Sequence, residues 1–236
     1  MENNPTVSII VPIANERELI ADALKHFLSL GADELIVVDG GSTDGTHQQM
    51  EDKFPGIPFF QTAYPNRAMQ MNLGAFESTG DVLLFLHVDM RLPQVAVVCI
   101  REKIRDGFVA GGFTKRYVPS NCWLRTYAAC LNTIYLRWMH CLVGTNAMFV
   151  KKSVFDVLHG FAETAFLEDV SFSDCVKKLG RLAIIRGPVS VSSRRYLQNG
   201  IAKQIIRNGR ILLGYKVFRE DPEDLGMIYN MGCWFL

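Results

Sequence analysis

One stretch of the chain, residues 80–90, limits the choice of fold more than any other. It reads GDVLLFLHVDM, in which turn signals precede a short apolar run that ends in His87-Val88-Asp89. Such a run is typical of a strand buried on both faces, in the middle of a parallel sheet. In an extended segment, His87 and Asp89 point to the same side. Both could then bind a divalent metal in one crevice, or Asp89 could simply cap a helix that begins near Pro93.

The segments before this strand alternate between strand and helix patterns. Strands are predicted at 7–13, 34–38 and 57–63, and helices at 19–28, 46–54 and 67–78. This alternation is typical of a doubly wound fold with right-handed crossovers. The predicted fold class is therefore α/β, with a Rossmann-like, mixed but mainly parallel sheet flanked by helices.

After residue 92 the pattern is less regular. Helices are predicted at 93–106, 121–140, 153–158, 168–179 and 201–217, strands at 108–118, 146–151 and 181–187, and a basic turn at 192–196. A length of 236 residues without a low-complexity linker suits one domain. We expect a single domain over 1–236, with two halves, 1–92 and 93–217, and a tail, 218–236.

The composition excludes several classes of protein. The formal charge is +1, the pI is about 7.6, and no run is rich in Lys or Arg, so no nucleic-acid partner is expected. The six cysteines show no CxxC spacing, which favours the reducing interior of the cell over a disulfide framework. The sequence shows neither a signal peptide nor an apolar window long enough to span a membrane. The expected location is cytoplasmic.

Residues 121–140 leave peripheral membrane contact open. This predicted helix interleaves four aromatic residues with two arginines: Trp123, Arg125, Tyr127, Tyr135, Arg137 and Trp138. Core packing with arginine head groups reaching water is the favoured interpretation. The alternative is docking at the inner face of a membrane, which would bring a lipid-linked acceptor near the site.

Polar residues follow three of the predicted strands, at the edge where open α/β sheets bind ligands. Pro12, Asn15 and Glu16 follow the first strand, the loop that begins at Asp39 follows the second, and the His-x-Asp segment follows the fourth. The Asp39 loop, DGGSTDG, carries two acidic residues that would repel a phosphate, so a base or ribose suits it better. Its similarity to the first motif of S-adenosylmethionine-dependent methyltransferases is loose, because an equally good strand precedes it and GxGxxG is absent.

Six segments, in order, resemble a family 2 glycosyltransferase of the GT-A fold. They are VSIIVPIANE (7–16), ELIVVDGGSTDGT (34–46), Arg67 with QMNLGA (70–75), GDVLLFLHVDM (80–90), GTNAMFVKKSVFDVLHGF (144–161) and FLEDVSFSDCVKKLG (166–180). The resemblance covers roughly residues 5–200 of the chain. Arg67-x-x-Gln70, FLHVD and SSRRY also resemble a bacterial branch described as arsenosugar-biosynthesis or radical-SAM-associated glycosyltransferases.

The resemblance implies a donor site for a UDP- or GDP-sugar in the half 1–92, with the acceptor side in 93–217. The implied nucleotide-binding residues are Pro12, Asn15, Glu16, Asp39, Gly41 and Arg67. Asp39 would accept a hydrogen bond from the base, Gly41 would let the backbone approach the ribose, and Arg67 would reach the base or the diphosphate.

The resemblance also implies a metal, Mn2+ or Mg2+, that bridges the sugar diphosphate. Asp89 occupies the last position of the Asp-x-Asp motif of the family, and His87 replaces the first carboxylate. An imidazole is a softer ligand than a carboxylate and suits Mn2+ somewhat better than Mg2+. His87 could instead contact a phosphate.

Glu168 and Asp169 place two adjacent carboxylates at a predicted helix N-terminus. By resemblance to the family, Asp169 is the general base of an inverting transfer to a hydroxyl acceptor, with Glu168 beside it. The alternative is that both acids only favour the helix dipole. Arg194 and Arg195 could clamp the diphosphate or form a solvated basic turn.

The leading hypothesis is therefore an inverting, metal-assisted enzyme that transfers a sugar from a nucleotide sugar. A nucleotide-sugar-binding protein without catalysis is the alternative, since His87 departs from the family pattern and Gly144-Thr145-Asn146 stands where the related branch often has Gly-Asp-Gln. A methyltransferase is a remote third. The sequence specifies neither the sugar, the base nor the acceptor.

Overall fold

The computed structural model describes residues 4–164, 167–221 and 224–226 of the chain. Its strands are β1 (Val7–Ile13), β2 (Glu34–Asp39), β3 (Phe59–Gln61), β4 (Val82–Phe85), β5 (Met90–Arg91), β6 (Ala110–Val118), β7 (Phe149–Lys151) and β8 (Leu182–Ser192). Its α-helices are α1 (Ile20–Ser29), α2 (Thr46–Lys53), α3 (Arg67–Glu77), α4 (Ala96–Arg105), α5 (Cys122–Cys130), α6 (Lys152–Val157), α7 (Glu168–Val176), α8 (Arg194–Asn199) and α9 (Ile201–Leu213). Two π-helical segments, η1 (Leu131–Trp138) and η3 (Gly214–Phe218), continue α5 and α9, and a 3-10 turn, η2 (Gly144–Asn146), precedes β7.

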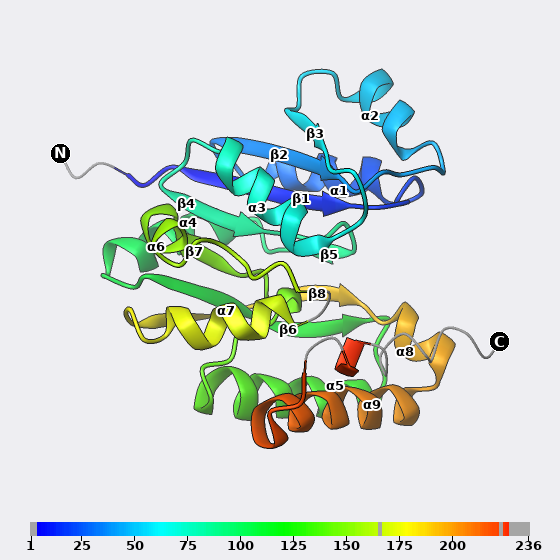
Figure 1. The fold of residues 1–236 in the computed structure, drawn as a ribbon, viewed down its shortest axis with the longest axis vertical. Coiled ribbons are helices and arrows are strands. Elements are labelled where there is room, and N and C mark those ends of the chain that lie inside the picture. The colour runs from blue at the N-terminus through cyan, green and yellow to red at the C-terminus, as the bar shows by residue number, and fades with distance from the viewer. Residues whose placement is uncertain (1–3, 165–166, 222–223, 227–236) are drawn as a thin grey trace.

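The described strands form one mixed sheet in the order β3-β2-β1-β4-β7-β6-β8-β5. The first four are parallel, and β6 is parallel to β8. The pairs β4–β7, β7–β6 and β8–β5 are antiparallel. The predicted α/β class with a mixed, mainly parallel sheet is confirmed. Because β4 pairs with β7, the two expected halves share one sheet (Figure 1).

The first half follows the predicted alternation closely because its strands are continuous buried runs. Every residue of β1 and β4 is buried, as expected for central strands. Helix α3 packs tightly on this sheet at Gly74, where a Cβ would lie 2.5 Å from Cγ2 of Ile10. This close approach fixes α3, and with it Arg67 at its first position, above the carboxyl end of β1.

The second half differs from the prediction in three places. Strand β8 continues to Ser192 instead of ending at Gly187, because it pairs with β6 as far as Val118. The expected basic turn is wrong: Arg194 begins the short helix α8. The predicted helix 121–140 is divided into α5 and the π-helical η1.

The two tryptophans of that helix are not core residues. Trp123 is 70% exposed and Trp138 is 77% exposed, so core packing is wrong for both. Tyr127 and Tyr135 are half-buried and line an internal cavity instead. Within the ranges that the structure covers, no helix combines the length and apolar character needed to cross a bilayer. Most of the predicted tail, including Cys233, lies outside the described residues.

Candidate functional site

A cavity of about 960 Å³ opens at the carboxyl ends of β1 and β4 and extends between β6, β8, α5 and α9. Eight of the twelve residues predicted from the sequence line it: Pro12, Glu16, Arg67, His87, Asp89, Asp169, Arg194 and Arg195. Four do not: Asn15, Asp39, Gly41 and Glu168. The fold thus brings residues that are more than 180 positions apart in the sequence to one surface.

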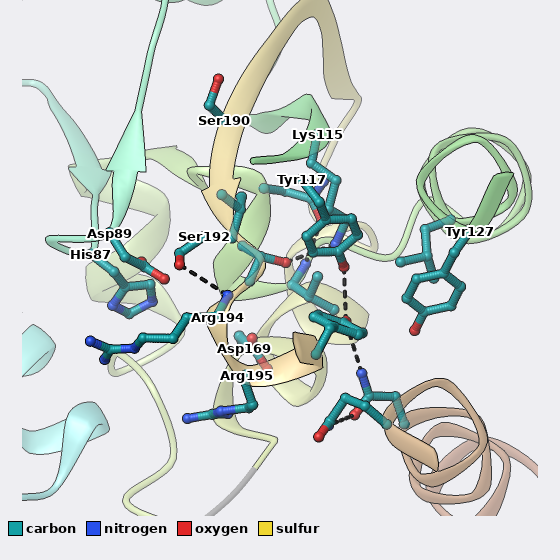
Figure 2. A pocket seen from close by; sticks show the side chains of 18 of the residues that line it. His87, Asp89, Lys115, Tyr117, Tyr127, Asp169, Ser190, Ser192, Arg194 and Arg195 are labelled. Atoms are coloured by element: carbon teal, nitrogen blue, oxygen red, sulfur yellow. Dashed lines mark hydrogen bonds between the residues drawn. The ribbon is translucent and has the colours of Figure 1, made fainter. Parts of the chain in front are cut away.

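His87 and Asp89 lie side by side at this surface (Figure 2). They stand in a turn after β4, closed by the Met90 amide donating to the His87 carbonyl (3.0 Å), and not in the extended segment assumed from the sequence. Burial, reinforced by Arg67, lowers the pKa of His87 to about 3, so its imidazole is neutral near pH 7 and can act as a metal ligand. Asp89 is not a helix cap, since α4 begins at Ala96 without a side-chain cap.

Acidic and basic side chains face one another across the outer part of the cavity. Burial raises the pKa of Asp89, and Arg195 and Arg194 oppose that rise. Burial also raises the pKa of Glu16, and the nearby Asp89 carboxylate adds to the effect. Arg194 and Arg195 are exposed, but they line this cavity and do not form a separate solvated turn.

His87 and Asp89 fit a metal that is shared with a ligand. In the part of the chain that the structure describes, no three His, Cys, Asp or Glu residues gather into a complete metal site. Mg2+ and similar ions bound with nucleotides need only one or two protein ligands, because phosphate oxygens and water supply the rest. A neutral imidazole next to a carboxylate meets that requirement.

Arg67, Glu168 and Asp169 form a compact charged cluster. The guanidinium of Arg67 donates from Nε to the Glu168 carboxylate, and its Nη2 lies 3.6 Å from Oδ2 of Asp169. The amide of Gly144 donates to the same Asp169 oxygen. Glu168 therefore holds Arg67, whereas the Asp169 carboxylate reaches the cavity.

The backbone of Gly144 lies at the centre of this cluster. A Cβ on Gly144 would come within 3.1 Å of Nε2 of His87, 3.2 Å of Oδ2 of Asp169 and 3.5 Å of Nη1 of Arg67. A side chain at this position would crowd the place where the three side chains converge. The sequence contained this glycine within GTN, but it gave no sign of what would surround it.

Asp39, Asn15 and Gly41 build the loops behind the cavity. The Asp39 carboxylate is fully buried and accepts hydrogen bonds from the Ser42 amide (3.1 Å to each oxygen) and hydroxyl. Asn15 accepts from the Thr43 amide at 2.8 Å and thereby ties the first loop to the second. Gly41 has φ of 84°, a conformation that favours glycine. Direct contact of these three residues with a nucleotide stays a prediction.

The inner part of the cavity is lined by residues that the sequence analysis did not single out. Lys115 and Tyr117 come from β6, and Tyr196 comes from α8. The hydroxyls of Tyr117 and Tyr196 are 2.9 Å apart, and Nδ2 of Asn208 donates to the Tyr196 hydroxyl at 3.0 Å. One signal was available, because Lys115 stands two residues from Phe113 and from Tyr117, and such spacing in a strand puts it on the same face as two aromatic residues.

The sheet order and a charged crevice at the strand ends define a GT-A-type protein. The model of glycosyl transferase family 2 matches residues 8–158, and the chain belongs to this family. Against the probable glycosyltransferase YdaM of Bacillus subtilis (strain 168) it is 27% identical over 206 residues, which cover 76% of this chain and 48% of YdaM. The chain thus spans about half the length of this relative. Family membership leaves the methyltransferase alternative without support.

Solved structures share the fold at low sequence identity. The mannosyltransferase PcManGT from Pyrobaculum calidifontis, in complex with GDP-Man and Mn2+, has a TM-score of 0.68 at 17% identity, covering 99% of this chain and 71% of PcManGT. S. aureus TarS 1-349 in complex with UDP-GlcNAc has a TM-score of 0.63 at 15% identity, and the match covers 97% of this chain and 71% of TarS 1-349. Glucosyl-3-phosphoglycerate synthase from Mycobacterium tuberculosis, with Mn2+ and UDP, has a TM-score of 0.61 at 18% identity, and the match covers 87% of this chain and 79% of the synthase chain.

Proposed function

We propose that the chain is an inverting, metal-assisted glycosyltransferase that moves a sugar from a UDP- or GDP-sugar to a hydroxyl acceptor. One observation carries the proposal: the Asp169 carboxylate and the His87–Asp89 pair line the same cavity. Family membership supports sugar transfer. The structural relatives that bind GDP-Man, UDP-GlcNAc or UDP support a nucleotide donor.

The donor would lie on the β1–β4 side, with its diphosphate near Asp89. A nucleoside diphosphate that leaves with its electron pair gains negative charge, and fixed cations stabilise that charge. Arg194 and Arg195 line the cavity close enough to influence the pKa of Asp89, so they suit this task. Mn2+ or Mg2+, bound by Asp89 and His87 with the diphosphate, would neutralise further charge on the leaving group.

Asp169 would remove the proton of the attacking hydroxyl. Its Oδ2 is oriented by the Gly144 amide and lies near Arg67, so the carboxylate is fixed in place. Glu168 would act as a positioning residue, because its carboxylate holds the Arg67 guanidinium and does not line the cavity. Attack from the side of the base, opposite the leaving group, inverts the anomeric centre.

Asp169→Asn tests this assignment. Nucleoside diphosphate release from a panel of UDP- and GDP-sugars with Mn2+ would be compared between the wild type and the variant. A general base contributes about 10²- to 10⁴-fold, so a loss of that size is expected. The asparagine keeps an oxygen for the Gly144 amide, so the fold should persist. Asp156→Asn, the same change at an exposed position on α6, is the matched control and should keep full activity.

The same assay separates the enzyme from a nucleotide-sugar-binding protein. A binder would show a thermal shift with a nucleotide sugar but no release with any donor or metal. Normal turnover by Asp169→Asn would instead show that another group is the base.

A further inference from the structure

Lys115 is aimed into the cavity by an irregularity in the sheet. Between Phe113 and Lys115, β6 advances two residues while its partner β8 advances four, from Ile185 to Val189. Strand β7 pairs with β6 only at Ala110 and Gly111. At Lys115, β6 therefore has β8 on one side and no described strand on the other. The side chain of Asn132, in η1, takes that place by accepting from the Lys115 amide and donating to its carbonyl, each at 2.9 Å.

The Lys115 ammonium is buried without an opposite charge in contact. The residue is only 5% exposed, and Nζ donates one hydrogen bond, to Oγ1 of Thr145 at 2.7 Å. It forms no ion pair with any carboxylate in residues 4–164, 167–221 or 224–226. Asp169 is the carboxyl group that acts on it electrostatically, and the Cys141 thiol is the other titratable group that does so. Buried ammonium groups that lack a partner are costly, so a binding function explains this one better than packing does.

Figure 2 shows Lys115 on the β6 side of the cavity and the His87–Asp89 pair on the other side. The donor diphosphate belongs with Asp89 if the proposed function is right. An anion bound at Lys115 would then belong to the acceptor.

We propose that Lys115 binds a carboxylate or phosphate group of the acceptor, next to the hydroxyl that Asp169 deprotonates. This inference rests on the proposed function for the identity of the acceptor side. It makes Lys115 a specificity residue: among the described residues, Nζ donates a hydrogen bond to Thr145 alone, which leaves two of its three N–H donors available to anionic oxygens. The acceptor class is therefore a hydroxy compound that carries a negative charge close to the reacting hydroxyl.

Binding of three small probes tests the inference. Glycerol 3-phosphate, D-glycerate and glycerol would be titrated by calorimetry into protein saturated with UDP or GDP and Mn2+, which fill the donor side. At least one anionic probe should bind saturably while glycerol does not, and the two anions distinguish phosphate from carboxylate. Lys115→Met should weaken that binding about 10- to 100-fold, as expected for a hydrogen bond to a charged group. Lys25→Met, at an exposed position on α1, is the matched control and should bind as the wild type does.

A second measurement needs no variant. In the wild type, affinity for the anionic probe should fall as the pH rises above 8, where Lys115 loses its charge. Equal binding by Lys115→Met, equal binding of glycerol, or no saturable binding of either anion would overturn the inference. If the protein releases nucleotide from a donor but binds the anionic probes no better than glycerol, the inference about Lys115 fails and the proposed function stands. If an anionic probe binds but no donor is turned over, the proposed function fails and the anion site at Lys115 stands.

A separate observation concerns the distribution of charge. Residues 1–106 contain 8 Lys and Arg but 15 Asp and Glu, whereas residues 107–236 contain 17 Lys and Arg but 9 Asp and Glu, four of these acids at 220–224. The net charge of +1 conceals this segregation. No Asp or Glu occurs in 122–138 or in 201–218, the two segments that form α5–η1 and α9–η3.

These two helical segments also carry exposed apolar side chains. On α5–η1 they are Trp123, Ile134 and Trp138, and on α9–η3 they are Ile206, Leu213, Val217 and Phe218. The same two segments carry the exposed basic residues Arg125, Arg137 and Lys203. α5 and α9 are in contact and form the layer farthest from β3 (Figure 1). Their inner sides line the cavity through residues such as Tyr127 and Asn208.

The geometry points to docking of this helical layer on an anionic lipid surface. Basic residues are attracted to anionic head groups, and tryptophans and aliphatic side chains enter the boundary between head groups and acyl chains. Nucleic acid fits less well, because it would leave the tryptophan and aliphatic side chains without an apolar partner. The inner side of the layer would remain open to the cavity, so an acceptor at the lipid surface could reach the site.

Cosedimentation with vesicles tests this docking. Binding is expected with phosphatidylcholine vesicles that contain phosphatidylglycerol, and not with pure phosphatidylcholine. It should weaken with salt. Trp123→Ala with Trp138→Ala should reduce it at least tenfold, whereas Phe76→Ala, 80% exposed on α3, should leave it unchanged. No binding, tighter binding to a single-stranded oligonucleotide, or a dimer that buries the tryptophans would each overturn it.

Discussion

Lys115 makes the stability of the protein depend on pH in a direction that can be calculated. Burial lowers its pKa from the ordinary 10.5 to about 8, with Asp169 opposing the shift. Between these two values the unfolded chain binds more protons than the native protein, so the free energy of unfolding rises with pH. A pKa shift of this size changes the free energy of unfolding by about 3 kcal/mol between the two pKa values, at about 1.4 kcal/mol per pH unit.

Urea unfolding of the wild type and of Lys115→Met between pH 8 and pH 9.5 measures this effect. The wild type should gain about 2 kcal/mol over this interval relative to the variant. The upper limit avoids the tyrosines: burial raises the pKa of Tyr117, Tyr127 and Tyr196, so above about pH 10 their ionisation favours the unfolded state. Parallel pH profiles for the two proteins would show that Lys115 carries an ordinary pKa.

At the scale of single elements, the sequence predicted what is encoded locally. The strands β1, β2 and β4 are continuous apolar runs, and the helices between them have one apolar face and a stop signal. These patterns require no knowledge of a distant partner. The polar residues at the strand ends followed from the same reasoning, because the carboxyl ends of parallel strands meet at one edge.

The elements that the sequence did not predict depend on remote partners. β5 has two residues and exists because Met90 and Arg91 pair with β8, about 100 positions later. The length of β8 depends on β6, and the position of Lys115 depends on Asn132 in a π-helical segment. No local pattern distinguishes such a segment from an ordinary helix. The exposed tryptophans were misjudged for the same reason, since amphipathic spacing does not say which face is covered.

At the scale of the whole molecule, the site lies where the two halves of one sheet meet. His87 and Asp89 follow β4, whereas Gly144 lies in η2, just before β7, and Asp169 lies in the first turn of α7. The buried core runs through both halves without any metal ligand in it, since Asp89 lies at the cavity surface. The fold should therefore be stable without a metal, while donor binding should depend on one.

Removal of the metal separates these two properties. EDTA should leave the melting temperature unchanged but stop nucleotide release until Mn2+ is restored. A nucleoside diphosphate and Mn2+ together should raise the melting temperature by more than the sum of their separate shifts, because a ligand that binds only the native state stabilises it and the metal joins the diphosphate to Asp89. Asp89→Asn should lose this excess shift, whereas Asp156→Asn should keep it. A lower melting temperature in EDTA alone would show that a metal holds the fold together, and merely additive shifts would show that the nucleotide and the metal bind at separate places.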